Sequence, residues 1–272
     1  MVSVLILTYN EQDNLPRCLE SVAWSDDVLV LDSFSTDRTT AIARDGGARV
    51  QQRSFDHFAG QRNFGLEHGA LRHDWVLHLD ADEVVPPGLR DELISIARNP
   101  SASDAYRVAS KMIFRERWLR YSGMYPTYQV RFGRCEKLRF RMVGHGQRET
   151  LPPEVVATLR EPLLHYSFSK GLDDWWARHQ RYAAAEAAEN LAVLAGHTRS
   201  LAALFAADRT ARRRALKELS VRLPCRPAMR FIYMYLIRLG FLDGAPGWEY
   251  CRMLAGYESM IVAQLRALRA KH

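Results

Sequence analysis

Val76-Leu77-His78-Leu79-Asp80-Ala81-Asp82-Glu83 is the stretch that decides the fold, because an apolar run of strand length ends there in two carboxylates one residue apart. Side chains alternate between the faces of a strand, so Asp80 and Asp82 are expected to share a face at its carboxyl end. Paired carboxylates at such an end can hold a hard divalent cation, and the cation can hold a diphosphate. A solvated turn before the next helix is the alternative interpretation.

Apolar runs and helical patterns alternate four times in about the first hundred residues. The runs that suit buried parallel strands are 2–7, 28–31, 48–50 and 75–79. This alternation predicts an α/β fold, with a Rossmann-like, mostly parallel sheet flanked by helices. Polar clusters follow three of the strands, at 8–11, 32–39 and 80–83. One edge of the sheet is therefore expected to present all three clusters to one ligand.

The middle and the end of the chain have a different character. Within 128–141 apolar and polar residues alternate as in half-buried antiparallel strands, and a glycine-rich polar loop follows at 143–149. Beyond Gly171 the pattern is helical. We therefore predict one α/β domain over residues 1–170 and a helical C-terminal region over residues 171–272.

The composition points to an anionic partner. The 272 residues carry a formal net charge of +7, with a pI of about 9.4, which suits a nucleotide, a phospholipid surface or nucleic acid. No nucleic-acid-binding module is recognisable, so nucleic acid is not the expected partner. We expect a cytoplasmic protein with reduced thiols, because the four cysteines are far apart, their even number does not indicate disulfides in a chain this long, and the first residues lack a signal-peptide pattern. No apolar run reaches the ~18 residues of a membrane span.

Four motifs occur in a recognisable order and spacing over roughly the first third of the chain. They are Leu-Thr-Tyr-Asn-Glu (7–11), Val-Leu-Asp-Ser-Phe-Ser-Thr-Asp-Arg-Thr (30–39), Gln-Arg-Asn-Phe-Gly-Leu (61–66) and Leu-Asp-Ala-Asp-Glu (79–83). With them the chain resembles the family 2 glycosyltransferases of the GT-A fold. Less specific stretches are similar to the bacterial branch of lipopolysaccharide-core β-glucosyltransferases: 165–167, 175–176, 181–183 and 240–244.

The resemblance implies that the domain over residues 1–170 binds a nucleotide sugar, with a UDP-sugar as the expected donor. The implied donor-binding residues are Thr8, Tyr9, Asn10, Glu11, Asp32, Arg62, Asp80 and Ala81. The first-strand turn would contact the base, Asp32 the base or ribose, and Arg62 would reach back to the nucleotide. The structural alternatives are an ordinary strand-to-helix turn, a helix cap and a solvated helix residue.

The resemblance also implies a divalent cation, Mg²⁺ or Mn²⁺. Asp82 is the expected direct ligand, with Asp80 and His165 as further candidates. The ion would bridge the two phosphates and stabilise the charge that develops on the leaving group. For His165, a satisfied core or surface histidine is the alternative.

An inverting transfer, which the family implies, needs a base within hydrogen-bond reach of the acceptor hydroxyl. Glu149 is favoured because it closes the glycine-rich loop where related sequences place His-Glu. In this chain His145 and Glu149 are separated, so both stay candidates. A hairpin whose glycines only supply positive φ is the alternative.

The C-terminal region carries a pattern typical of a membrane-surface element. An arginine-rich segment at 209–217 precedes the apolar segment 229–238, whose Phe231, Tyr233 and Tyr235 would sit at the interface with anionic lipid. A packed helix with a solvated basic face is the alternative. The region is thus expected to serve as an acceptor-binding or membrane-surface element.

We therefore expect an inverting, metal-dependent hexosyltransferase. It would move a hexose, with glucose as the best guess, from a UDP-sugar to a hydroxyl of a lipid-linked, lipopolysaccharide or other cell-surface glycan. Its expected location is the cytoplasm, peripheral on the inner face of the cell membrane. A sugar nucleotidyltransferase is disfavoured because the first-strand turn, Thr8–Glu11, lacks glycine. A non-catalytic nucleotide-sugar-binding module is the alternative if the base is absent.

Overall fold

The computed structural model describes residues 1–143, 146–195 and 225–270, with the single positions 212, 215, 219, 221 and 223. The chain divides into two compact units. The first contains Met1–Phe114 and Tyr125–Ser169, and the second contains Arg115–Met124 and Lys170–His272. The sequence-based division did not anticipate that residues 115–124 belong with the C-terminal helices.

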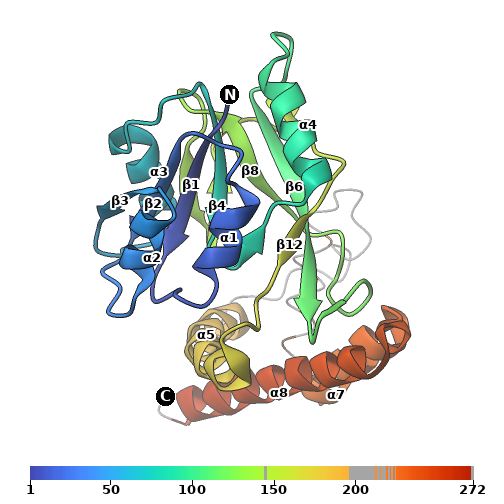
Figure 1. Ribbon diagram of the computed structural model, residues 1–272. Coiled ribbons are helices and arrows are strands. Elements are labelled where there is room, and N and C mark those ends of the chain that lie inside the picture. The colour runs from blue at the N-terminus through green and yellow to red at the C-terminus, as the bar shows by residue number, and fades with distance from the viewer. Residues whose placement is uncertain are drawn as a thin grey trace. The chain divides into compact units, whose positions relative to one another are not determined.

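The first unit is built on a mixed sheet with the strand order β3-β2-β1-β4-β8-β6-β12-β5 (Figure 1). Its strands are β1 (Ser3–Thr8), β2 (Val28–Asp32), β3 (Arg49–Gln52), β4 (Trp75–Asp80), β5 (Glu83–Val84), β6 (Ala105–Phe114), β8 (Tyr128–Arg134), β11 (Val156–Thr158) and β12 (Leu163–His165). A separate two-stranded ladder pairs β9 (Phe140–Val143) with β10 (Gly146–Glu149). The helices of this unit are α1 (Leu15–Ser21), α2 (Thr39–Asp45), α3 (Phe58–His68), α4 (Pro87–Ala97) and the 3₁₀ turn η1 (Pro153–Val155).

The first four strands in this order run parallel, as the sequence predicts. Thr8 at the end of β1 pairs in register with Asp32 of β2, and Leu7 pairs with Asp80 of β4. The carboxyl ends of the three strands therefore meet at one edge. Beyond β4 the sheet is mixed, because β8 runs antiparallel to both β4 and β6 while β12 runs parallel to β6. The predicted α/β fold with a Rossmann-like parallel half is confirmed, and a mixed half is added to it.

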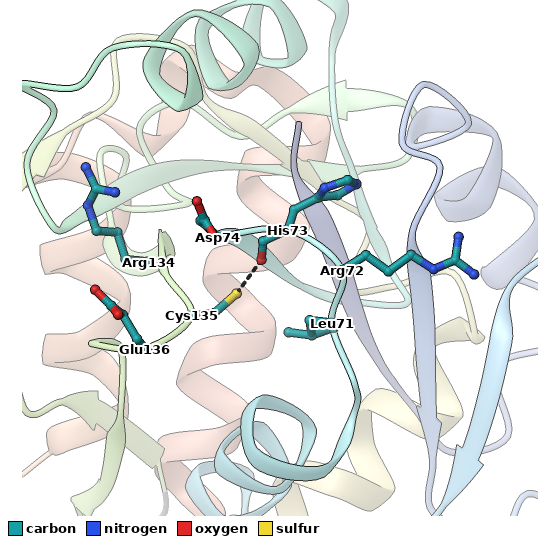
Figure 2. A pocket seen from close by; sticks show the side chains of 7 residues that line it. All are labelled: Leu71, Arg72, His73, Asp74, Arg134, Cys135 and Glu136. Atoms are coloured by element: carbon teal, nitrogen blue, oxygen red, sulfur yellow. Dashed lines mark hydrogen bonds between the residues drawn. The ribbon is translucent and has the colours of Figure 1, made fainter.

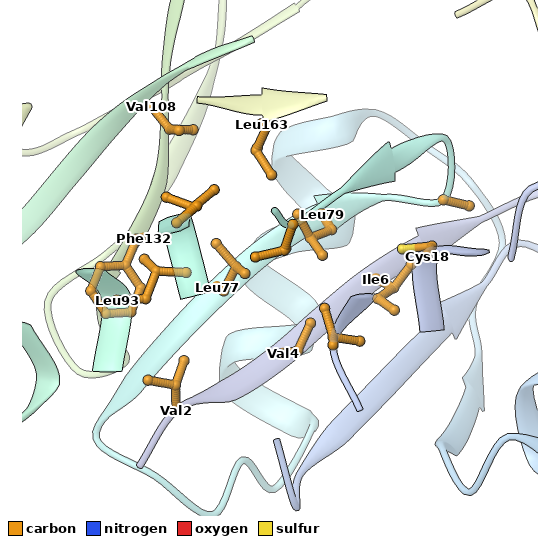
Figure 3. Close-up of a cluster of buried hydrophobic side chains, with 14 of the residues drawn as sticks. Val2, Val4, Ile6, Cys18, Leu77, Leu79, Leu93, Val108, Phe132 and Leu163 are labelled. Carbon is orange, nitrogen blue, oxygen red and sulfur yellow. The ribbon is translucent and has the colours of Figure 1, made fainter. Parts of the chain in front are cut away.

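Both faces of the parallel half are buried, which explains its nearly continuous apolar strands. On one face, alternate residues of β1 and β4 pack against α1, α2 and α4 (Figure 3). On the other face, Leu5, Leu29 and Val76 pack with residues of α3. Here α3 approaches β1 so closely that a Cβ on Gly65 would lie 2.4 Å from Leu5 Cδ2. A larger residue at this position would have to displace the Leu5 side chain, so glycine allows α3 to lie this close to the sheet.

The second unit is helical, as predicted for the C-terminal region. It contains the short strand β7 (Arg117–Trp118) and the helices α5 (Gly171–Ala195), α7 (Arg226–Ile232), π helix η3 (Tyr233–Ile237), 3₁₀ helix η4 (Gly240–Asp243) and α8 (Gly244–Arg269). Small residues of α5, Ala183 and Ala187, pack against Ile261 and Leu265 of α8. The predicted basic segment 209–217 lies outside the described residues apart from its positions 212 and 215.

Residues 115–124 are held inside the second unit by two carboxylates, Asp243 and Glu249. The Asp243 side chain accepts hydrogen bonds from the backbone N–H groups of Arg120, Tyr121 and Ser122, at 2.7 to 3.3 Å. Arg115 makes a two-pronged contact of 2.6 Å with Glu249 on α8.

Among the helices that the structure describes, none is long and apolar enough to cross a bilayer.

Candidate active site

The carboxyl ends of β1 and β2 are joined through Asp32. Its side chain is fully buried, and Thr8 Oγ1 donates to Oδ1 at 3.0 Å. The amide of Gln52 and the backbone N–H of Ser35 donate to Oδ2 at 3.0 and 2.9 Å, and the Ser35 hydroxyl donates to Oδ1. The carboxylate is thus surrounded by neutral donors of the protein itself. Its predicted contact with base or ribose stays a prediction.

The turn after β1 is tied to the loop after β2. Asn10 has a φ of 52°, a left-handed conformation that asparagine tolerates better than most residues. Its backbone N–H donates to Ser35 Oγ, and its side-chain oxygen accepts from the Thr36 N–H, both at 2.8 Å. The Glu11 N–H donates to Thr39 Oγ1 at 2.7 Å. The turn and the loop therefore form one structure.

Tyr9 is the exposed member of this turn. Its side chain is 57% exposed, while its neighbour Thr8 is buried. A solvent-facing aromatic ring beside a fixed loop is suited to stack on a nucleobase. The structure therefore brings together the predicted residues 8–11 and Asp32, with Tyr9 as the one that faces solvent.

Asp80 at the end of β4 is held by two buried arginines. Its Oδ1 lies 2.8 Å from Nη2 of Arg62, and its Oδ2 lies 2.6 Å from Nη2 of Arg131. Arg131 also contacts Glu83 Oε1 at 2.8 Å, and Glu83 Oε2 accepts the Asp80 N–H at 2.9 Å. The two arginines are 1% and 3% exposed. Both oxygens of Asp80 are therefore engaged by guanidinium groups.

The charges in this cluster shift one another. Burial alone would raise the pKa of Asp80, but Arg131 and Arg62 outweigh it and hold that pKa well below the usual range. Burial together with the charge of Arg131 lowers the pKa of Arg62 to about 10. Burial raises the pKa of Glu83. The buried imidazole of His78 is neutral, because burial and the nearby Arg62 keep its pKa well below its usual value.

Several nitrogens of this cluster have no hydrogen-bond partner among the described residues. They are Nε and Nη1 of Arg62, Nε and Nη1 of Arg131, and both ring nitrogens of His78. Buried polar nitrogens of this kind are usually satisfied by water or by a ligand. Unused hydrogen-bonding capacity, mostly that of guanidinium donors, is therefore concentrated beside the end of β4.

Asp82 and His165 form a second pair just beyond Asp80. Asp82 Oδ2 lies 3.3 Å from His165 Nε2, and the Tyr166 N–H donates to the Asp82 carbonyl at 2.9 Å. The antiparallel pairing of β5 with β12 places His165 beside Glu83 and so brings the two segments together. Burial would lower the pKa of His165, but Asp82 and the neighbouring carboxylates raise it to about 9.

Asp82 and His165 fit a divalent cation better than Asp80 does. Carboxylate oxygens suit Mn²⁺, and the His165 imidazole could join them once its proton is released. Both side chains are partly exposed, at 20% and 30%. Mg²⁺ and Mn²⁺ sites in nucleotide enzymes commonly use one or two protein ligands and complete the shell with phosphates and water. No group of three His, Cys, Asp or Glu that could hold a metal occurs among the described residues, so the three-ligand set is not assembled.

Of the two candidate bases, Glu149 and His145, only Glu149 is among the residues that the structure describes. Glu149 ends β10 and pairs with Phe140 of β9. Directly opposed residues of antiparallel strands point to the same face, so Glu149 shares the face of Phe140. The Phe140 ring lies 5.1 Å from the His78 ring and 6.0 Å from the Arg62 guanidinium, which puts this face toward the Asp80 cluster. His145 lies outside the described residues.

Ala81, Arg131 and Glu83 differ most from the expectations. The methyl of Ala81 packs in the hydrophobic core, so only its backbone is placed to meet a ligand. Arg131 was not predicted as a site residue, because its segment was interpreted only as an alternating, half-buried strand. Glu83 lies in the two-residue strand β5, is 1% exposed and contacts Arg131.

A pocket of about 360 Å³ lies elsewhere on the first unit (Figure 2). It is lined by Leu71, Arg72, His73, Asp74, Arg134, Cys135 and Glu136. Asp74 immediately precedes β4, and Arg134 ends the antiparallel β8. The pocket is therefore at the edge of the sheet opposite to Asp80 and does not belong to the candidate active site.

The family model for glycosyl transferase family 2 matches residues 3–146, more than half of the chain. The match includes every element that carries Thr8, Asp32, Arg62 and Asp80. The chain belongs to this family.

Curated relatives with glycosyltransferase names match the chain over part of their length. An uncharacterized glycosyltransferase of Rickettsia bellii is 30% identical over 183 residues, which covers 61% of this chain and 60% of that protein. The lipopolysaccharide core biosynthesis glycosyltransferase LpsC of Rhizobium meliloti is 30% identical over 115 residues, covering 40% of this chain and 42% of LpsC. The chain thus spans about 60% of the length of the first of these relatives.

Solved structures also resemble the chain. Glucosyl-3-phosphoglycerate synthase from Mycobacterium tuberculosis, in complex with Mn²⁺, uridine diphosphate and glucosyl-3-phosphoglycerate, superimposes with a TM-score of 0.45. It is 18% identical, and the match covers 68% of this chain and 78% of that one.

Proposed function

We propose that this protein transfers a hexose, with glucose as the best guess, from a UDP-sugar to a hydroxyl group of a lipid-linked, lipopolysaccharide or other cell-surface glycan. The reaction is metal-dependent and inverts the anomeric carbon. Membership of glycosyl transferase family 2 supports transfer of a sugar. The likeness to LpsC, named for lipopolysaccharide core biosynthesis, supports the choice of acceptor.

The observation that carries the proposal is the convergence of three strand ends. Thr8 hydrogen-bonds Asp32, Leu7 pairs with Asp80, and Asp82 follows Asp80 by two residues. Ligands of open α/β sheets bind outside the carboxyl ends of the strands, which is where these side chains gather. Ends that diverged could not hold the base and the diphosphate of one nucleotide.

The residues divide the work along this edge. Tyr9 and the turn around it bind the nucleobase. Arg62 and Arg131 offset the charges of Asp80 and Glu83 and so reduce the repulsion that an anionic donor would meet at the end of β4. Asp82 and His165 would hold a divalent cation, which when bound would supply Lewis-acid stabilisation of the departing diphosphate.

Glu149 acts as the base in this proposal. Its carboxylate accepts the proton of the acceptor hydroxyl, whose oxygen attacks the anomeric carbon as the bond to the diphosphate breaks. The placement of Glu149 on the face of Phe140, toward the Asp80 cluster, supports this role. His145 is the second candidate for the same step.

Donor binding is tested by thermal shift with UDP-, GDP- and dTDP-sugars in the presence of Mn²⁺. A ligand that binds only the folded protein raises its Tm. We expect UDP-glucose to raise the Tm of the wild type and to have a much smaller effect on Asp82→Asn. An equal Tm rise in both proteins would contradict the role of Asp82.

The base is tested by turnover with a glycan acceptor. Glu149→Gln should lose turnover by about 100-fold or more while it keeps the Tm rise with donor. Glu154→Gln is the matched control, because Glu154 is exposed in η1. If His145→Ala loses turnover and Glu149→Gln does not, the base is His145. Donor binding without turnover on any acceptor would favour the non-catalytic nucleotide-sugar-binding module.

A further inference from the structure

An apolar surface lies along α7, the π helix and η4 of the second unit. Eight of the fourteen residues from 229 to 242 are large apolar side chains that are at least 38% exposed. They are Met229, Ile232, Tyr233, Leu236, Ile237, Leu239, Phe241 and Leu242, which we call the 229–242 face. Ile237 is the most exposed of them, at 68%. Exposed apolar residues gathered in one place mark interaction surfaces far more often than scattered ones do.

The side chains of the face point to solvent because the opposite side of the same helix packs against the rest of the second unit. Positions 229, 232, 233, 236 and 237 follow the three- and four-residue spacing of one helix side. On the other side Met234 is fully buried, and Phe231 and Tyr235 stack at 5.2 Å. Both rings also contact Trp248 of α8 edge-on, at 5.0 and 5.1 Å.

This packing changes the residues expected at an interface. The sequence pattern named Phe231, Tyr233 and Tyr235, but Phe231 and Tyr235 belong to the inner stack. Ile232, Leu236 and Ile237 take the exposed positions instead. The exposed side is therefore mainly aliphatic, with Tyr233 and Phe241 as its aromatic members.

The charged side chains inside the segment 226–242 are all basic, while the acidic Asp243 and Glu258 adjoin it. Residues 226–242 contain three arginines, Arg226, Arg230 and Arg238, and no acidic residue. Arg226 is paired with Glu258 of α8 at 2.5 Å. Arg230 and Arg238 are half-buried, which suits side chains whose stems lie along apolar surface while their heads reach its margin.

We propose that the 229–242 face docks in the plane of a bilayer surface that contains anionic phospholipid. Its aliphatic side chains would enter the acyl boundary, and Arg230 and Arg238 would meet the headgroup phosphates. Seven α-helical and five π-helical residues make a helix on the order of 18 Å long, much shorter than the ~30 Å hydrocarbon core. The helix therefore lies along the surface.

Hydrogen bonding favours a lipid over a protein partner. Among the eight side chains of the face, only Tyr233 carries a hydroxyl group that can donate a hydrogen bond. Protein interfaces carry about one hydrogen bond per 100–200 Å², whereas acyl chains require none. A basic margin around an apolar centre also complements a negatively charged headgroup layer.

The test is co-sedimentation of the full chain with vesicles, without any nucleotide sugar, so that a failed transferase assay has no bearing on the result. Vesicles of phosphatidylcholine with phosphatidylglycerol should bind more protein than pure phosphatidylcholine, and salt should weaken the binding. The double variant Leu236→Gln/Ile237→Gln should partition about 10-fold less or lower. Its Tm should match the wild type, because both side chains are exposed.

Phe55→Gln is the matched control, since Phe55 is 53% exposed in the first unit, and it should bind vesicles like the wild type. Equal binding by wild type and double variant would overturn the proposal. The proposal would also be overturned if the wild type formed a dimer without lipid in sedimentation velocity and the double variant were monomeric. The occupant of the face would then be a second copy of the chain.

Discussion

The two carboxylates that end β2 and β4 lie at the same sheet edge and are held in opposite ways. Asp32 is surrounded by neutral donors, namely the hydroxyls of Thr8 and Ser35, the Ser35 N–H and the Gln52 amide. Asp80 faces the guanidinium groups of Arg62 and Arg131. The first arrangement joins two strands, and the second places buried charge where a diphosphate would bind.

This difference predicts how the stability of the fold responds when Asp32 or Asp80 loses its charge. Hydroxyl groups rotate and act as donors or acceptors, so the neighbours of Asp32 adapt. Guanidinium groups only donate and keep their charge, so the neighbours of Asp80 do not. Four substitutions or conditions test this contrast, in order of decreasing effect.

Arg131→Met should have the largest effect on stability. Arg131 bridges Asp80 and Glu83, and its loss leaves both carboxylates with less compensation inside the protein. Breaking a buried ion pair from one side costs about 3–5 kcal/mol, which urea denaturation should detect. Arg134→Met is the matched control on the same strand, because its contact with Asp104 is 3.7 Å and partly exposed. Its loss should cost about 0–1 kcal/mol, and equal costs would refute the contrast.

Asp80→Asn should cost about 2–3 kcal/mol in the unfolding free energy. The amide NH₂ would point at a guanidinium donor, and the partial exposure of Asp80, 32%, reduces the penalty below that of a fully buried pair. Urea denaturation at neutral pH measures it. An unchanged midpoint would show that the arginines do not depend on Asp80 for compensation.

Asp32→Asn should cost less than about 1 kcal/mol, although Asp32 is the more buried residue. The asparagine oxygen can take the place of Oδ2 and accept from Ser35 and Gln52. Its NH₂ then donates to the hydroxyls of Thr8 or Ser35. Asp32→Leu removes the acceptors and is the contrasting variant, with a cost of several kcal/mol. A larger loss for Asp32→Asn than for Asp80→Asn would reverse the comparison.

Asp27 has both neutral and guanidinium donors as partners. Its substitution should give the smallest of the four effects, a change in how the unfolding free energy depends on pH. Burial would raise its pKa, but the Arg72 N–H, the Ser3 hydroxyl and Arg49 outweigh burial and hold the pKa below 3.8. The ionised form therefore stabilises the fold above pH of about 4, and this contribution is lost as the pH falls toward the folded-state pKa. Asp27→Asn should lose less unfolding free energy than the wild type between pH 7 and pH 3, and parallel losses would contradict this.

The parallel half of the sheet was predictable because its signals are local. Each strand is a short apolar run, and each polar cluster follows it directly, so the alignment of Thr8, Asp32 and Asp80 follows from the geometry of parallel strands. The pairing of Arg62 with Asp80 was within reach, since Arg62 was already expected to point to the nucleotide.

The mixed half was harder because its contacts join distant parts of the chain. Arg131 alternates with Val130 and Phe132, which suggests a solvent-facing position, yet β8 lies between β4 and β6 and is covered on both sides. The environment of His165 depends on the pairing of β5 with β12, and a two-residue strand has no sequence signature. The inward packing of Phe231 likewise depends on Trp248 in the next helix.

Residues 115–124 leave the α/β unit and return to it, and Asp243 fastens their backbone from far along the chain. A chimera that took the helices of one family member and the sheet of another would therefore have to cross over at three points. With a single crossover near residue 170, residues 115–124 would come from one parent and Asp243, which binds their backbone, from the other. Successful shuffling between relatives should therefore keep residues 115–124 together with the C-terminal helices.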